Sequence, residues 1–151
     1  MKHMEIKGSF PLLYTNMKIL IFGLSGSGKT TLANELNKQI QFTRINADDI
    51  RKKWNDWDFS MAGRLRQAKR LKELADNTNN SITDFIAPTQ NIRDIFDADI
   101  TIWMDTVDNS KYKDTDTLFE KPLNICYHVT DKDATKWAEL IFKETEWTFK
   151  M

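Results

Sequence analysis

The feature that most constrains the fold is the segment from residue 17 to residue 31, MKILIFGLSGSGKTT. An apolar run of β-prone residues leads into a glycine-rich turn, and a lysine and two threonines follow the turn. Residues 23–30 satisfy the pattern G-x-x-x-x-G-K-[ST] in full. Glycines in such a loop let successive backbone N–H groups face inward, and the N-terminus of the following helix favours an anion. The segment therefore predicts a cradle for a phosphate chain between a strand and a helix.

The register of the loop predicts which side chains contact a nucleotide. The expected phosphate-binding residues are Gly23, Ser25, Gly26, Ser27, Gly28, Lys29, Thr30 and Thr31. Lys29 would place a positive charge on the outer phosphates, and the Thr30 hydroxyl would ligate Mg²⁺. A plain glycine turn would not explain the lysine and threonine in register. The cofactors predicted are therefore ATP and Mg²⁺.

Short apolar runs and amphipathic segments alternate along the rest of the chain. The predicted strands are 18–22, 42–46, 81–87, 99–104 and 124–129. The predicted helices are 29–39, 50–54, 61–75 and a last one from an Asp131 cap to residue 142. Such alternation implies right-handed crossovers. We therefore predict an α/β fold of the P-loop kinase type, a mainly parallel five-stranded sheet with helices on both faces.

The 151-residue chain has the length of one domain. Because the first strand starts at Met17, residues 1–16 are interpreted as a native or vector-derived extension and residues 17–151 as the kinase domain. Residues 105–122 are polar and charged, and we expect a mobile loop there that acts as a reduced lid or is a plain surface excursion.

Charge and cysteine content exclude several classes of protein. The chain has 22 lysine and arginine residues and 22 aspartate and glutamate residues, so its net charge is zero. A neutral chain argues against a nucleic-acid partner. The chain has a single cysteine, Cys126, so it cannot form an internal disulfide. The only histidines are His3 and His128, which argues against a zinc centre. Cys126 is expected inside a buried strand, and the tryptophans are expected to pack in the core. The longest apolar run near the N-terminus is too short to span a bilayer, so a cytoplasmic setting is the default expectation.

Motifs after the loop follow an order that resembles adenylyl-sulfate kinase, which transfers the γ-phosphate of ATP to the 3′-hydroxyl of adenosine 5′-phosphosulfate. Residues 23–33 reproduce the family's GLSGSGKTTLA without change. Residues 45–51 match its L-D-G-D-N-[VI]-R segment in part, and residues 58–70 echo its G-F-S-x-x-D-R-x-x-N-I-R-R segment. Its I-S-P and Y-E-x-P elements correspond to residues 86–88 and 119–122.

The chain also departs from this family. Asn46 and Ala47 replace the first two residues of D-G-D, whereas Asp48 retains the second aspartate. Gly63-Arg64 replaces D-R, and Gln67 replaces the asparagine three positions further on. The helix between the third and fourth strands is cut to almost nothing, and the basic lid is reduced. The chain is accordingly identified as a shortened, divergent member.

The acceptor side is predicted from residue chemistry and from the resemblance. The expected acceptor-binding residues are Asp48, Arg51, Phe59, Arg64 and Gln67. Asp48 and Lys29 are the predicted catalytic residues, because a carboxylate must orient or deprotonate the acceptor hydroxyl. The alternative role for Asp48 is that of an N-cap of the following helix, and Asp49 is the stronger candidate for that cap. The alternative for Arg51 and Arg64 is that they lie on solvent-exposed helix faces. Arg93 either reaches the donor phosphates, as the resemblance implies, or packs structurally.

The leading prediction is an ATP-dependent kinase acting on a hydroxyl of a small anionic acceptor, with adenosine 5′-phosphosulfate as first candidate. One alternative is a kinase for a nucleoside, a nucleotide or a nucleic-acid hydroxyl. Another is a nucleotide-binding protein that has lost phosphoryl transfer, which Asn46 and the short lid would suit. A homodimer is compatible with each of them, and no membrane partner is expected.

Overall fold

The computed structural model describes residues 16–150, with side chains described to residue 145. The strands are β1 (Lys18–Phe22), β2 (Thr43–Asn46), β3 (Ser81–Asp84), β4 (Ile100–Met104) and β5 (Tyr127–Val129). The helices are α1 (Lys29–Ile40), α2 (Ala47–Trp54), α3 (Met61–Asp76), α4 (Gln90–Phe96), α5 (Lys113–Leu118) and α6 (Ala134–Lys150). The expectations for residues 1–15, including His3, and for the Trp147 side chain lie outside the described part.

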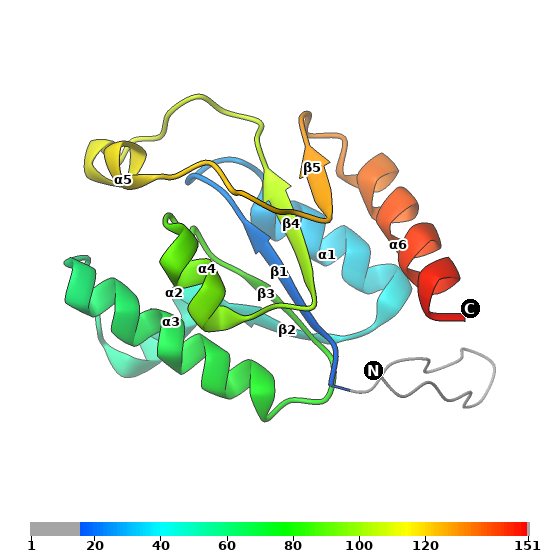
Figure 1. The fold of residues 1–151 in the computed structure, drawn as a ribbon, viewed down its shortest axis with the longest axis horizontal. Coiled ribbons are helices and arrows are strands. Elements are labelled where there is room, and N and C mark those ends of the chain that lie inside the picture. Colours follow the sequence, from blue (N-terminus) through cyan, green and yellow to red (C-terminus); the bar gives the residue numbers. More distant parts are fainter. Residues whose placement is uncertain (1–15, 151) are drawn as a thin grey trace.

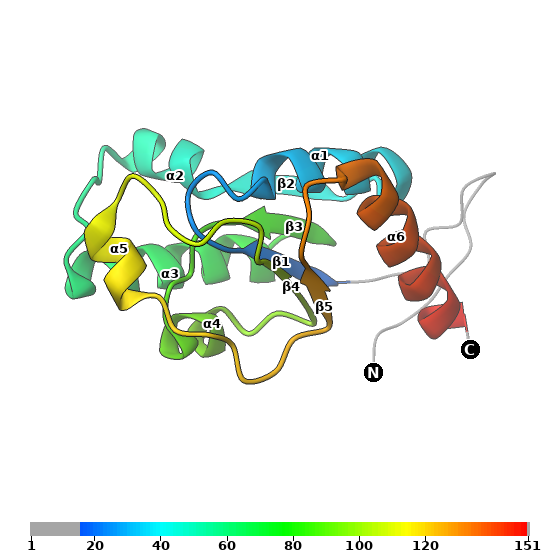
Figure 2. The same cartoon turned by 90° about the horizontal axis from the view of Figure 1, so that it is seen from above.

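The five strands form one parallel sheet in the order β2-β3-β1-β4-β5. Helices α1 and α6 lie on one face of the sheet, and α3 and α4 lie on the other (Figures 1 and 2). The predicted α/β architecture, a mainly parallel five-stranded sheet with helices on both faces, is confirmed. No helix among residues 16–150 has the length and apolarity needed to cross a bilayer.

Alternate residues of the central strand β1 enter two separate cores. Ile19 and Ile21 pack with α1 and α6, whereas Leu20 and Phe22 pack with α3 and α4. All five residues of β1 are buried. A parallel strand covered by helices on both faces needs such a continuous apolar run. The strand therefore holds the glycine-rich loop rigidly at its carboxyl end.

Two helices were not expected from the sequence. Helix α4 follows Thr89, whose side chain accepts the Ile92 N–H at 3.2 Å, and it packs on α3. Helix α5 lies inside residues 105–122, so the prediction of a loop throughout that segment is wrong. Both helices are too short, at seven and six residues, for their periodicity to be visible in the sequence.

Two predicted helix caps are wrong. The Asn46 side chain accepts the Asp49 N–H at 3.0 Å, so α2 begins at Ala47 and Asp49 lies in its first turn. Asp133 accepts an N–H from the first turn of α6 at 3.3 Å, so it takes the place predicted for Asp131. Each of these two side chains satisfies a helix N–H that would otherwise be unpaired.

Three side chains differ in burial from the prediction. Cys126 is exposed, because the edge strand β5 is shorter than predicted and starts at Tyr127, three residues later than predicted, so Cys126 lies just before it. Trp54 and Trp57 are 57% and 51% exposed and do not belong to the core. Arg70 lies over the Trp54 ring at 4.7 Å, which covers part of it. Trp54 ends α2, Trp57 and the exposed Phe59 lie in the connection from α2 to α3, and the latter two line the cleft described next.

Candidate active site

The carboxyl ends of β1, β2 and β3 lead into one cleft of about 660 Å³. Ligands of open parallel sheets bind at this edge. The predicted residues that line the cleft are Ser25, Gly26, Gly28, Lys29, Thr30, Thr31, Asp48, Arg51, Phe59, Arg64 and Gln67. Two predicted residues, Gly23 and Ser27, are not in its lining. The structure thus brings the phosphate loop and the proposed acceptor residues to the same cavity.

Gly23 and Gly28 shape the glycine-rich loop. A Cβ atom on Gly23 would lie 2.6 Å from the Met104 carbonyl oxygen, so no side chain fits there. Gly28 has φ of +97° and forms the N-cap of α1 without a capping side chain. The first N–H groups of α1 are therefore left for an anion. The Thr106 hydroxyl donates to the Ser27 carbonyl at 2.6 Å and ties the loop to the end of β4.

Lys29 is the cation of the loop. Its Nζ donates to the Leu24 carbonyl at 2.9 Å, across the turn. Burial lowers the pKa of Lys29 to about 8, although the carboxylates of Asp84 and Asp48 act in the opposite direction. A phosphate group would supply the missing negative charge, so this ammonium is prepared for an anionic ligand.

We expect nucleotide affinity to decrease above pH 8 for this reason. A bound phosphate would raise the pKa of Lys29 again, so binding at high pH takes up a proton. Relative to pH 7, the Kd for ATP at pH 9 should be larger by about tenfold. Calorimetry at pH 9 in buffers of different ionisation enthalpy should detect the uptake. The Lys29→Met protein, which has no proton to gain there, is the control, and equal uptake by both proteins would contradict the assignment.

Asp84 belongs to the site but was not predicted. It is the last residue of β3 and is 2% exposed. Its Oδ2 accepts from the Thr30 hydroxyl at 2.9 Å and from Asn46 Nδ2 at 2.8 Å, and its Oδ1 accepts from Arg44. The strand was predicted to continue to residue 87, so the sequence did not show that Asp84 lies at the carboxyl end of the strand beside β1, where ligands bind. The resemblance passed over it, because the family motif used at that point begins at Ile86.

The donor set at this end fits Mg²⁺. A hydroxyl and a carboxylate are hard oxygen donors, and Mg²⁺ in kinases takes one or two such ligands plus phosphates and water. Thr30 and Asp84 are the residues that could hold it, because their oxygens already touch. No group of three His, Cys, Asp or Glu side chains suited to a metal occurs among the described residues. Nucleotide phosphates would therefore supply the remaining ligands.

Asp48 presents a carboxylate to the cleft from the first turn of α2. The cap role considered for it belongs to Asn46. Its negative charge acts on both Lys29 and Arg51. An exposed carboxylate between a phosphate-binding lysine and a buried arginine can accept a proton from a hydroxyl.

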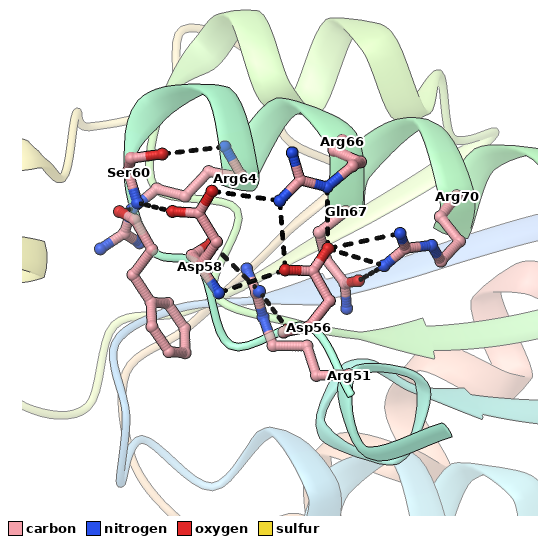
Figure 3. A network of polar contacts seen from close by, with 10 residues as sticks. Arg51, Asp56, Asp58, Ser60, Arg64, Arg66, Gln67 and Arg70 are labelled. Carbon is pink, nitrogen blue, oxygen red and sulfur yellow. Dashed lines mark hydrogen bonds and ion pairs between the residues drawn. The ribbon is translucent and has the colours of Figure 1, made fainter. Parts of the chain in front are cut away.

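Arg51 and Arg64 are buried, at 5% and 7% exposure, so the solvated helix faces considered for them are excluded. Their guanidinium carbons lie 4.2 and 5.6 Å from the Phe59 ring centroid. Arg64 Nε donates to the Phe59 carbonyl at 2.9 Å. Gln67 Nε2 donates to the Ala47 carbonyl at 2.9 Å, so this amide group joins α3 to α2. The two arginines and the ring form one wall of the cleft. Figure 3 shows the two arginines.

The segment that contains α5 adjoins this wall and also lines the cleft. Arg64 Nη2 donates to the Thr115 hydroxyl at 3.0 Å and lies 3.4 Å from Asp114. Lys111 and Tyr112 also line the cleft. The reduced lid therefore contacts an acceptor-side arginine directly.

Arg93 has the structural role that was one of its two interpretations. Its guanidinium lies between the Phe22 and Phe119 rings, 4.5 and 5.0 Å from their centroids. It donates to the Ala87 carbonyl at 2.8 Å and the Glu120 carbonyl at 2.7 Å. Burial lowers the pKa of Arg93 to about 10. The residue supports the end of the lid segment and is not in the lining of the cleft.

Solved kinase structures share this fold. The APS kinase CysC of Mycobacterium tuberculosis, in complex with AMPPNP and APS, has a TM-score of 0.72 and 20% identity over 86% of this chain and 97% of its own. A sugar kinase from Janibacter sp. HTCC2649 has a TM-score of 0.69 and 16% identity over 86% and 94%. The shikimate kinase of Acinetobacter baumannii in complex with shikimate has a TM-score of 0.62 and 17% identity over 87% and 94%.

Those identities establish the fold and leave the acceptor open, and no curated protein matches the sequence. The family model of adenylylsulphate kinase matches residues 15–130, which include the glycine-rich loop, Asp48, Arg51 and Arg64. The chain therefore belongs to the adenylylsulphate kinase family of ATP-dependent phosphotransferases.

Proposed function

We propose that the protein transfers the γ-phosphoryl group of MgATP to a hydroxyl of a small anionic acceptor, with adenosine 5′-phosphosulfate as the first candidate. One observation carries the proposal. A single cleft contains Lys29 and Asp84 at the phosphate loop and two buried arginines, Arg51 and Arg64, on the acceptor side. Asp48 lines the same cleft and interacts electrostatically with both ends.

The proposed step is an in-line displacement. The acceptor hydroxyl oxygen bonds to the γ-phosphorus, the bond from that phosphorus to the β–γ bridging oxygen breaks, and ADP leaves. Asp48 orients the hydroxyl and takes its proton. Lys29 and the loop N–H groups stabilise charge on the phosphate oxygens. When bound, Mg²⁺, which Thr30 and Asp84 would hold, neutralises charge between the β and γ phosphates.

The acceptor class follows from the wall opposite the phosphate loop. Guanidinium groups match phosphate and sulfate, and the Phe59 ring offers a face to a planar base. Adenosine 5′-phosphosulfate combines both features. A nucleoside or nucleotide is the second candidate, because two further aromatic residues, Trp57 and Tyr112, line the cleft and would stack on any base. The zero net charge argues against nucleic acid as the acceptor.

ADP release from MgATP, with and without adenosine 5′-phosphosulfate, tests the proposal. Acceptor-dependent ADP release by the wild-type protein, absent in Lys29→Met, is the expected result. No stimulation with ATP binding intact would exclude this acceptor, and nucleosides and nucleotides would then be screened in the same assay. ATP binding without transfer to any of them would favour the alternative of a protein that has lost transfer.

Asp48→Asn should separate binding from transfer. Asparagine keeps the size of the side chain and removes its basicity, so we expect the ATP Kd within about twofold and kcat lower by about 10²-fold. Titration calorimetry gives the first value and ADP release the second. Asp49→Asn, one residue further on the exposed side of α2, is the matched control. A kcat unchanged in Asp48→Asn would remove the proposed role of Asp48 in proton transfer.

A further inference from the structure

Residues 55–60 connect α2 to α3 and carry two aromatic residues of the cleft, Trp57 and Phe59. A network of charged side chains holds this connection against α3 (Figure 3). Arg66 binds the Asp56 carboxylate through two parallel hydrogen bonds, Nε to Oδ2 at 2.8 Å and Nη2 to Oδ1 at 3.1 Å. Arg70 adds contacts to Asp56 Oδ2 at 3.3 Å. The first part of the connection is therefore fixed by a two-point contact.

The second part is fixed by Asp58. Its Oδ2 accepts from Arg66 Nη2 at 3.1 Å, and its Oδ1 accepts the Ser60 N–H at 2.9 Å. Asp58 in turn donates its N–H to Asp56 Oδ1 at 3.2 Å. Hydrogen bonds from Arg66, above all, hold the pKa of Asp56 well below its usual range, so the network stays charged at any working pH. One arginine thus contacts both carboxylates of the connection.

Gly63 allows the connection to follow this path. A Cβ atom at position 63 would lie 2.1 Å from the Asp58 carbonyl oxygen and 2.5 Å from Asp58 Cγ. Any other residue would displace Asp58 or α3. The resembling family has aspartate at this position, and in this chain Asp58 occupies the space its side chain would need. The departure from the motif therefore has a local structural consequence on the acceptor side.

The connection also orients Arg51. Arg51 Nη1 donates to the carbonyl oxygens of Asp56 at 2.8 Å and Asp58 at 3.2 Å. The Phe59 ring lies against the same guanidinium group. A shift of residues 56–59 would therefore move an arginine and an aromatic ring of the cleft together.

We propose that Gly63 and Arg66 are positioning residues that hold residues 55–60 in place and so determine which acceptor the cleft accepts. Neither residue lines the cleft. Their influence on an acceptor passes through Arg51, Phe59 and Trp57. The acceptor part of this inference rests on the proposed function, whereas the part concerning the connection does not.

Arg66→Gln should change acceptor binding without changing the stability of the fold. The Arg66 side chain is 48% exposed, and exposed ion pairs contribute little to global stability. A guanidinium fork nonetheless fixes geometry, and neither glutamine nor lysine reproduces two parallel N–H groups. We expect KM for adenosine 5′-phosphosulfate to rise about tenfold, with kcat and KM for ATP within about twofold. Arg66→Lys should give an intermediate effect.

Hydrogen–deuterium exchange tests the positioning part without an acceptor. In Arg66→Gln, the N–H groups of Asp58 and Ser60 should exchange about tenfold faster, while the phosphate loop is unchanged. Lys69→Gln, an exposed residue of the same helix, is the matched control and should match wild type in both measurements. Unchanged exchange at Asp58 and Ser60 in Arg66→Gln would overturn the proposal, whatever acceptor the enzyme uses.

Gly63→Ala provides an independent variant. Alanine favours a helix over glycine, so with free space at position 63 the variant would be equally or more stable with normal kinetics, whereas the Cβ there would overlap the Asp58 carbonyl oxygen. We expect instead faster exchange in residues 55–60 and a KM for adenosine 5′-phosphosulfate raised about tenfold. If that compound is not turned over, the proposed acceptor fails and the exchange result alone decides on positioning. Faster exchange with an unchanged KM for a confirmed acceptor would overturn the specificity role.

Discussion

Lys29→Met should slow acceptor-dependent ADP release by on the order of 10³-fold, equivalent to about 4 kcal/mol of transition-state stabilisation. Methionine retains the unbranched side chain and removes the charge that would lie on the outer phosphates. No other lysine or arginine lies within residues 23–30, so the glycine-rich loop itself has no second cation to replace that charge. ADP release and ATP titration on the purified variant measure the loss.

The same substitution should not destabilise the ligand-free protein. Burial lowers the pKa of Lys29 to about 8 from 10.5, so its charged form is less favourable in the folded than in the unfolded chain at pH 7. That penalty decreases as the pH rises from 8 to 10.5, because the folded protein loses the proton first. Denaturant unfolding at pH 7 should give Lys29→Met a stability equal to or above wild type, with a smaller difference at pH 9.5. A clear destabilisation at pH 7 would show that Lys29 supports the fold.

Asp84→Asn should reduce kcat by a similar factor, on the order of 10³-fold, and weaken its dependence on Mg²⁺. Asparagine can still accept from Thr30, so the loop should keep its shape. It lacks the charge needed to hold a divalent cation with the Thr30 hydroxyl. Titration of activity with Mg²⁺ measures the change, and normal activity at low Mg²⁺ would contradict the assignment.

Arg44 separates the structural contribution of Asp84 from its chemical one. Arg44 pairs with Asp84 at 2.5 Å, so Asp84→Asn leaves a partly buried guanidinium without its counter-charge. We expect destabilisation by about 2 kcal/mol. The double variant Arg44→Gln, Asp84→Asn should recover most of that stability and none of the activity. Recovery of activity in the double variant would mean that Asp84 acts only as the partner of Arg44.

The phosphate loop could be predicted because its parts are contiguous. Strand β1, the glycine-rich turn and the start of α1 lie within residues 17–31, so their spacing is visible in the sequence. The central strands β1 and β4 could also be predicted, because strands covered on both faces are largely apolar along their length. The two helices that were not predicted, α4 and α5, have only seven and six residues. Nothing periodic distinguishes them from a loop.

Asp84 illustrates a residue whose role depends on strand pairing. Parallel pairing sets Asp84 opposite Ile21 of β1 and Asn46 of β2, and its side chain meets Thr30 of α1. One carboxylate in the sequence SITDF carries no sign of those neighbours. The caps of α2 and α6 were wrong for a related reason, since several adjacent polar residues could each have capped the helix.

The sequence by itself determined the family, the main strands and the phosphate loop, because each is carried by short motifs whose residues are contiguous in the chain. Only the tertiary structure decided that Arg51 and Arg64 are buried beside Phe59, and that Gly63 leaves room for Asp58. Arg64 also meets Thr115, 51 residues further along the chain. Burial and close approach arise when distant segments pack. The type of a single residue does not show which distant residue it will contact in the packed protein.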